Sequence, residues 1–167
     1  MLYAGIGSRE TPENILKLMQ DIATELKKLG YRLCTGGAPG ADTAFAKGDP
    51  DAQIYLPWAG YNGVEKPTMV GPTLEAINIA STFHPAWHNC KSGARKLHGR
   101  NIHILFGSKL DTPVDFVICW TKDGKDSGGT GQAIRAAIAN NIPVFNLQHT
   151  GVMVELNNYL VEKGIVK

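Results

Sequence analysis

The sequence predicts a single α/β domain over residues 1–167, with a parallel sheet flanked by helices. Two observations support this prediction. Short apolar runs typical of strands alternate with helical patterns along the chain, and three of these runs lead into glycine-rich turns. Such alternation produces parallel strands joined by right-handed helical crossovers. The chain is 43% hydrophobic and 19% charged, which suits one sizeable core and excludes a disordered or fibrous protein.

The first half of the chain repeats the order strand, glycine turn and helix. Leu2 to Ile6 is a short apolar run, and Thr11 before Pro12 predicts a helix start with threonine as N-cap. Apolar residues then recur at helical spacing as far as Leu29, and Gly30 ends that helix. A strand, a short helix and a third strand are predicted next, at residues 31–35, 41–47 and 52–58.

The region from Ala59 to Cys90 has scattered proline and glycine, and we expect a long excursion in which only Leu74 to Ala80 is helical. The run "VDFVICW" further on is almost entirely apolar, as in a parallel strand covered on both faces. A helix precedes this run, and a glycine turn with its helix, a strand and a closing helix follow it, at residues 92–106, 127–138, 142–147 and 152–162.

The sequence also predicts the cellular location of the protein and the state of its cysteines. The first residues, "MLYAGIGSRE", lack the pattern of a signal peptide, and no apolar run is long enough for a membrane span, so we expect a cytoplasmic protein without a membrane partner. The three cysteines, Cys34, Cys90 and Cys119, lack CxxC spacing and indicate neither a disulfide framework nor a zinc site. We expect reduced thiols, with Cys34 and Cys119 in the core, and no cofactor.

Charge is unevenly distributed along the chain. From Ala76 to Leu110 there is no Asp or Glu, whereas five Lys and Arg give this segment a charge of +5 within a chain of net charge +2. Part of the surface is therefore expected to attract anions, with a solvated helix face as the alternative interpretation. His98 and His103 also lie in this segment as possible general bases, although a lone helical histidine is more often structural.

Three strand-to-helix turns are rich in glycine: "GIGSR", "GGAPGAD" and "SGGTG". In a parallel sheet these turns gather at the carboxyl ends of the strands, where ligands bind. Glycines bring backbone N–H groups close to a ligand, and helix N-termini add partial positive charge, which together suit phosphate. The turns predict an anionic, nucleotide-like ligand. None is a Walker A loop, and Gly5-Ile6-Gly7 lacks the third glycine of the dinucleotide fingerprint.

The stretches "YAGIGSR", "TGGAPGADTAFAKG" and "SGGTGQAIRAA" before "IPVFNL" resemble the SLOG superfamily. This Rossmann-like group includes the DprA recombination mediators, the LOG-type phosphoribohydrolases and ligand-sensing domains. The resemblance spans Leu2 to about Leu147 and is closest to short DprA-like proteins of the kind often encoded by bacteriophages.

The resemblance implies a ligand pocket formed by the three turns. Its implied lining residues are Gly7, Ser8, Arg9, Gly36, Gly37, Asp42, Gly128, Gly129, Thr130 and Gly131. Asp42 has a second interpretation as a polar residue that bonds the helix start, and Arg9 has one as a surface charge.

The LOG-type pattern PGGxGTxxE breaks at the third turn. Ser127, Gln132 and Arg135 occupy the positions of its proline, threonine and glutamate, so the carboxylate of the familiar hydrolase mechanism is missing. Asp123 and Asp126 could substitute for it but are more typical of loop-solvating residues. Gln132 could read a base edge or a ribose hydroxyl, and further phosphate contacts are predicted from Arg95, Arg100, Asn101 and Arg135. Arg135 has a second interpretation as a solvent-facing residue of an amphipathic helix.

Three functions remain open. The first is a nucleotide-derived ligand binder without turnover, such as a phage protein that sequesters a cyclic ADP-ribose relative. The second is DprA-like binding of single-stranded DNA, with bases stacked on aromatics from the irregular middle: Trp58, Tyr61, Phe83 and Trp87. The third is an N-glycosidic nucleotide hydrolase whose carboxylate is displaced to Glu65 or Glu75. In each case we expect a homo-oligomer.

Overall fold

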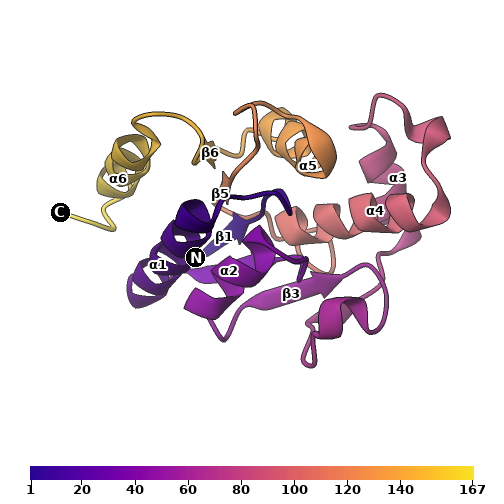
Figure 1. Cartoon of the computed structure of the whole chain (residues 1–167), viewed down its shortest axis with the longest axis horizontal. Helices are drawn as coiled ribbons and strands as arrows, with labels where there is room; N and C mark the ends of the chain where they lie inside the picture. Colours follow the sequence, from indigo (N-terminus) through magenta and orange to yellow (C-terminus); the bar gives the residue numbers. More distant parts are fainter.

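The computed structural model describes all 167 residues and contains one six-stranded parallel sheet of Rossmann-like type, flanked by six helices (Figure 1). The strand order is β4-β3-β2-β1-β5-β6, and every neighbouring pair is parallel. The strands are β1 Leu2–Gly5, β2 Arg32–Thr35, β3 Gln53–Leu56, β4 Met69–Val70, β5 Phe116–Cys119 and β6 Val144–Asn146.

Three helices cover each face of the sheet, and the period-2 alternation of strand side chains divides the core between them. Tyr3 and Leu33 pack with α1, α2 and α6, whereas their neighbours Ala4 and Cys34 pack with α3, α4 and α5. The helices are α1 Glu13–Lys28, α2 Ala41–Gly48, α3 Leu74–Ser81, α4 Ser92–Phe106, α5 Gly128–Ala139 and α6 Val152–Glu162.

The direction of winding reverses between β1 and β5. From β1 the chain adds β2, β3 and β4 outward on one side, then returns through α4 to place β5 and β6 on the other side. The loops that leave β1 and β5 therefore diverge at the carboxyl edge of the sheet. A crevice forms at such a switch point, where open α/β sheets bind their ligands.

The structure confirms the predicted helices and strands with small shifts at their ends, and it corrects two details. Thr11 is not the N-cap: the backbone of Pro12 is still extended (φ −62°, ψ 153°), so α1 begins at Glu13. The Thr11 hydroxyl instead donates to the Ser8 carbonyl at 2.6 Å and closes the first turn. The middle excursion also contains β4, a strand of two residues that leaves no recognisable sequence pattern, and it has two short 3-10 helices, Tyr61–Gly63 and Trp87–Asn89, in addition to α3.

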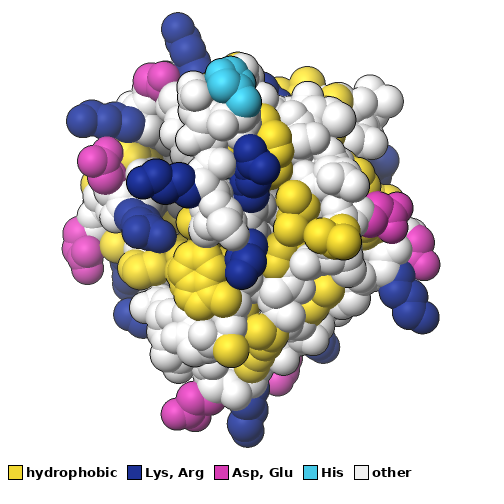
Figure 2. Space-filling view, turned by 90° about the vertical axis from the view of Figure 1, so that its right-hand side faces the viewer, with side chains coloured by type: hydrophobic (Ala, Val, Ile, Leu, Met, Phe, Trp, Pro, Cys, Tyr) yellow, Lys and Arg dark blue, Asp and Glu magenta, His cyan; other side chains and the backbone are white.

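Cys34 and Cys119 are buried, as predicted. None of the helices combines the length and apolar character required to span a bilayer. The acid-free segment forms α4, all but the first two residues of α3, and the connection between these helices. Figure 2 shows Lys and Arg side chains toward the middle of this face, with Asp and Glu near its margins. The predicted charge asymmetry is thus displayed on one side of the molecule.

Candidate ligand-binding cleft

The three glycine turns meet in a cleft of about 540 Å³ at the switch point. The cleft is lined by residues of the turns that follow β1, β2 and β5 and by one side of α4. Of the residues predicted for the ligand pocket, the lining includes Gly7, Ser8, Arg9, Asp42, Arg100, Asn101, Gly128, Gly129 and Thr130. A concavity of this size lies within the ordinary range for small-molecule sites.

The first turn is packed tightly against both of its neighbours. A Cβ on Gly7 would lie 2.7 Å from that of Ala41 and 3.3 Å from the Trp120 carbonyl oxygen, so only glycine fits between α2 and β5. The Ser8 N–H donates to the same Trp120 oxygen at 3.2 Å. Arg9 follows directly and donates to the Tyr61 hydroxyl at 3.2 Å. The turn therefore fixes a guanidinium at the cleft wall.

The second turn is organised by the buried carboxylate of Asp42, which accepts the Ala38 N–H at 3.2 Å. Burial raises the pKa of Asp42 to about 6, while the positive charge of Arg100 opposes the rise. Arg100 is itself buried and donates to the carbonyls of Gly36 and, at 3.3 Å, Tyr55. Asp42 thus bonds its own turn, as the alternative interpretation proposed, and it also lines the cleft.

Gly36 and Gly37 support this turn without lining the cleft. A Cβ on Gly36 would lie 2.7 Å from Nη1 of Arg100 and 2.8 Å from the Asp42 carboxylate. Gly37 has a φ of +69°, a conformation that other residues rarely adopt. Both glycines therefore have a structural reason to be glycine.

The third turn presents free donors. No hydrogen bond within the chain uses the N–H groups of Gly128, Gly129 and Thr130, the first three residues of α5. Ser127 occupies the N-cap position, but its hydroxyl donates to Asp123 at 2.7 Å and does not cap the helix. Three donors and the positive end of the helix dipole therefore remain available to an anion.

Besides Gly36 and Gly37, four predicted ligand contacts do not line the cleft: those of Arg95, Gly131, Gln132 and Arg135. A Cβ on Gly131 would lie 2.1 Å from the Asp126 carbonyl oxygen, so this glycine permits a close turn. Gln132 is fully buried, and its Oε1 accepts from Asn101 at 3.3 Å. Their contact with a ligand stays a prediction, as it does for Gly36 and Gly37.

Both arginines in this group hold the connection between α3 and α4. Arg135 donates from Nε to the Phe83 carbonyl and from Nη1 to the Asp126 carbonyl, each at 2.8 Å. Arg95 lies over the ring of Trp87 and donates to its carbonyl at 3.3 Å. Each guanidinium therefore has acceptors within the chain that sequence reasoning could not identify.

Sequence reasoning missed several lining residues, of which Lys122 and Tyr61 matter most for ligand chemistry. Lys122 comes two residues after the buried run that ends at Trp120, and its place behind a predicted strand was an available signal. Tyr61 appeared only as a possible base-stacking aromatic. Its ring also faces the Arg100 guanidinium, with 5.6 Å from the ring centroid to Cζ.

Neither of the two glutamates named for the hydrolase alternative lies at the cleft. Glu65 and Glu75 do not line the cleft, whereas Glu10 and Asp42 do. His103 is a satisfied core residue: its Nε2 accepts from the Thr73 N–H at 3.2 Å, and its Nδ1 lies 3.0 Å from the Gly107 carbonyl oxygen. His98 lines the cleft.

Neither a protein-family model nor a curated protein sequence matches the chain. Among solved structures, the fold is similar to that of DNA processing protein A (DprA) from Helicobacter pylori, in a study of the unique single-stranded DNA binding mode of that protein. The TM-score is 0.56 at 20% identity, and the match covers 100% of this chain and 74% of the other. The chain therefore has a DprA-like Rossmann-type fold.

Proposed function

We propose that the chain binds a nucleotide or a nucleotide-derived molecule in the cleft, with a phosphate at the N-terminus of α5. The observation that carries the proposal is the set of free N–H groups at Gly128, Gly129 and Thr130, which open onto the cleft at the switch point of the sheet. A phosphate accepts several such hydrogen bonds at once and is stabilised by the helix dipole.

The charges around these donors support an anionic ligand. Arg9 and Lys122 line the cleft, and Arg9 lies in a turn held by the hydrogen bond from Ser8 to Trp120. Arginine forms paired hydrogen bonds with phosphate oxygens, so a fixed guanidinium adds geometric selectivity as well as charge. The ring of Tyr61 offers an aromatic surface beside it.

In its finer form, the proposal is that a SLOG-type protein of phage origin sequesters a nucleotide immune signal, such as a relative of cyclic ADP-ribose. Its support is the sequence resemblance together with Arg135 at the position of the LOG-type glutamate. A protein that holds a signal needs tight binding and no turnover. The donors of the third turn support the first requirement, and the missing glutamate agrees with the second.

Isothermal titration calorimetry with nucleoside monophosphates, NAD and ADP-ribose derivatives tests the proposal. We expect Arg9→Gln to weaken the best of these ligands by about 10- to 100-fold, because a hydrogen bond to a charged group contributes about 1.5–3 kcal/mol. Arg32→Gln is the matched control. Arg32 is the first residue of β2, at the edge of the sheet away from the glycine turns, and it donates to the Asp51 carbonyl. Equal losses in both variants would place the ligand elsewhere, and release of free base on incubation would indicate a hydrolase instead.

Single-stranded DNA is the second candidate ligand. Two observations favour it: the DprA-like fold, and the basic face over α3 and α4 (Figure 2). Trp58 is 39% exposed and lies close to Gly93 of α4. An exposed aromatic beside basic residues suits stacked bases and phosphates. Fluorescence anisotropy with a labelled oligonucleotide, repeated with a saturating nucleotide, shows whether DNA uses the cleft or the basic face.

A further inference from the structure

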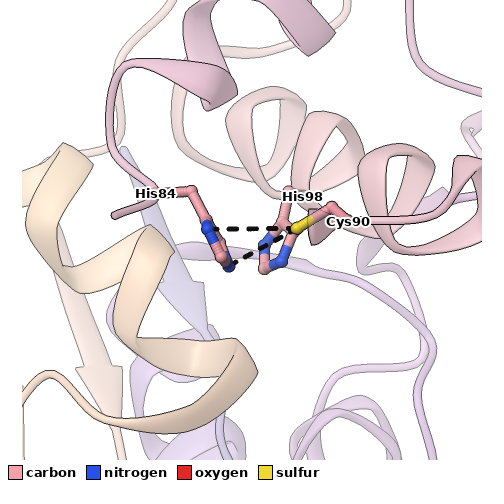
Figure 3. Close-up of side chains that lie close together, drawn as sticks. All are labelled: His84, Cys90 and His98. Atoms are coloured by element: carbon pink, nitrogen blue, oxygen red, sulfur yellow. Dashed lines mark hydrogen bonds between the residues drawn. The ribbon is translucent and has the colours of Figure 1, made fainter. Parts of the chain in front are cut away.

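A cluster of three side chains lies beside the ligand cleft. His84 and Cys90 come from the connection between α3 and α4, and His98 comes from α4 itself. One nitrogen of each histidine and the Cys90 sulfur all lie within 4.8 Å of one another, and Figure 3 shows the three side chains pointing toward one point. The sequence spacing resembles no CxxC pattern, so cysteine spacing did not reveal the cluster.

Each side chain has an electron pair to offer. Nδ1 of His98 is buried and makes no hydrogen bond, which is costly unless another group engages it. Nδ1 of His84 accepts the Ala86 N–H at 3.1 Å, so the lone pair of that ring is already engaged and must be released to zinc, at Nδ1 or, in the other tautomer, at Nε2. The Cys90 sulfur has only long contacts, 3.7 and 3.9 Å to the two His84 nitrogens and 3.8 Å to the Ala86 carbonyl oxygen.

The cluster is held in place from outside. The Trp87 ring packs against both histidines, and its centroid lies 6.1 Å from the centroid of each imidazole ring. The Arg95 guanidinium lies over the Trp87 ring, with 5.3 Å from Cζ to the ring centroid. Arg135 anchors the residue before His84 through its bond to the Phe83 carbonyl. Supports of this kind orient metal ligands in proteins.

The ligand set selects the ion. One thiolate and two imidazoles are borderline-soft donors that suit zinc, at distances of about 2.0–2.3 Å. Tetrahedral geometry at those lengths separates the two nitrogens and the sulfur from one another by roughly 3.3–3.6 Å. The shortest contact between Cys90 and His84, 3.7 Å, is already close to this range, and all three ligand atoms lie within 4.8 Å of one another. The thiolate charge partly offsets the positive charges of Arg100 and Arg135 near His98.

We propose that His84, Cys90 and His98 bind one zinc ion at the wall of the cleft. Three protein ligands leave a fourth position for water or for an anionic group, which is the pattern of zinc sites that act on a ligand. Because His98 also lines the cleft, the ion lies where a bound molecule can reach it. The proposal does not depend on the ligand being a nucleotide.

Zinc content and thiol reactivity test the site in the intact protein. After incubation with zinc sulfate and dialysis, we expect inductively coupled plasma mass spectrometry to find about one zinc ion per chain. Zinc affinity should fall by more than about 100-fold in the Cys90→Ala and His98→Gln variants. His88→Ala is the matched control, because His88 is an exposed histidine of the same connection. Retention of zinc in the Cys90→Ala variant would overturn the proposal.

Alkylation gives a readout that needs no variant to fold. Cys34 and Cys119 are buried, so iodoacetamide modifies Cys90 first in the folded protein. Zinc is expected to slow this reaction by at least about tenfold, because coordination occupies the sulfur lone pair. A Cys90 rate that saturating zinc leaves unchanged would equally rule out the site.

Discussion

Substitution of Gly129 by valine tests the cleft with little disturbance of the fold. A Cβ at Gly129 meets no atom within 4 Å, and the residue does not have the positive φ that strains other side chains. Glycine and valine differ by only a few tenths of a kcal/mol in helix propensity, so we expect the unfolding free energy to change by less than about 0.5 kcal/mol. The added methyl groups extend into the space that a phosphate would occupy.

The expected loss of affinity follows from the donors that the methyl groups cover. If the phosphate can no longer reach the N–H groups of Gly129 and Thr130, two hydrogen bonds to a charged group are lost, at about 1.5–3 kcal/mol each. A total of at least about 3 kcal/mol corresponds to more than a roughly 100-fold increase in the dissociation constant. Titration calorimetry measures this directly, and urea denaturation reports the stability of the same sample.

Gly93→Val is the matched control for this substitution. Gly93 is also exposed and is the second residue of its helix, and a Cβ there approaches only Trp58, at 3.9 Å. Gly93 does not line the cleft, so its variant should keep wild-type affinity. A folded Gly129→Val protein whose dissociation constant stays within about threefold of the wild type would refute the proposed phosphate position.

Three further predictions concern stability, pH and salt. Arg135→Ala should lower the free energy of unfolding by about 1–3 kcal/mol, because the carbonyls of Phe83 and Asp126 lose their donor. Urea denaturation measures this loss, and an unchanged free energy of unfolding would contradict it. Calorimetry of the same variant tests whether Arg135 also contacts the ligand. In the folded state the pKa of Asp42 is about 6, against 3.8 for the ordinary carboxyl, so between these pH values the folded state binds more protons than the unfolded state. The free energy of unfolding should therefore fall as the pH rises from 3.8 to about 6. Relative to Asp42→Asn, the expected decrease is about 3 kcal/mol. An unchanged difference in urea midpoint between pH 4 and pH 7 would contradict this. Single-stranded DNA should bind weakly and with steep salt dependence by fluorescence anisotropy, because a local charge of +5 neutralises few phosphates, and nanomolar binding that survives high salt would instead make DNA the principal ligand.

The sequence predicted the fold well because its local signals agree with one another. The apolar run at residues 114–120 and the helical pattern after Pro12 are strong, and each glycine turn stands where a strand meets a helix. Errors occurred where the signal is short or where one side chain has two possible partners. Strand β4 has two residues, and the Thr11 hydroxyl bonds the Ser8 carbonyl instead of capping α1.

The candidate cleft was predictable in part. Backbone turns bring Gly7, Gly128 and Gly129 to one edge by topology alone, and the structure places them there. Side-chain partners depend on packing between distant segments, which a sequence pattern does not encode. Arg135 bonds Phe83, 52 positions earlier in the chain, and the cluster of His84, Cys90 and His98 depends on how a connection of irregular structure folds back on α4.

Native mass spectrometry of the protein purified from bacterial cells tests most directly whether the cleft holds a nucleotide. We expect the wild type and Gly93→Val to retain an added mass that chromatography after release identifies as a nucleotide or a nucleotide-derived compound, and Gly129→Val to lose it. Zinc is identified separately by its own mass and remains in all three proteins. If the wild type carries no such compound and binds none of the supplied nucleotides in calorimetry, or if Gly129→Val retains it in full, the cleft between β1 and β5 is not a nucleotide site.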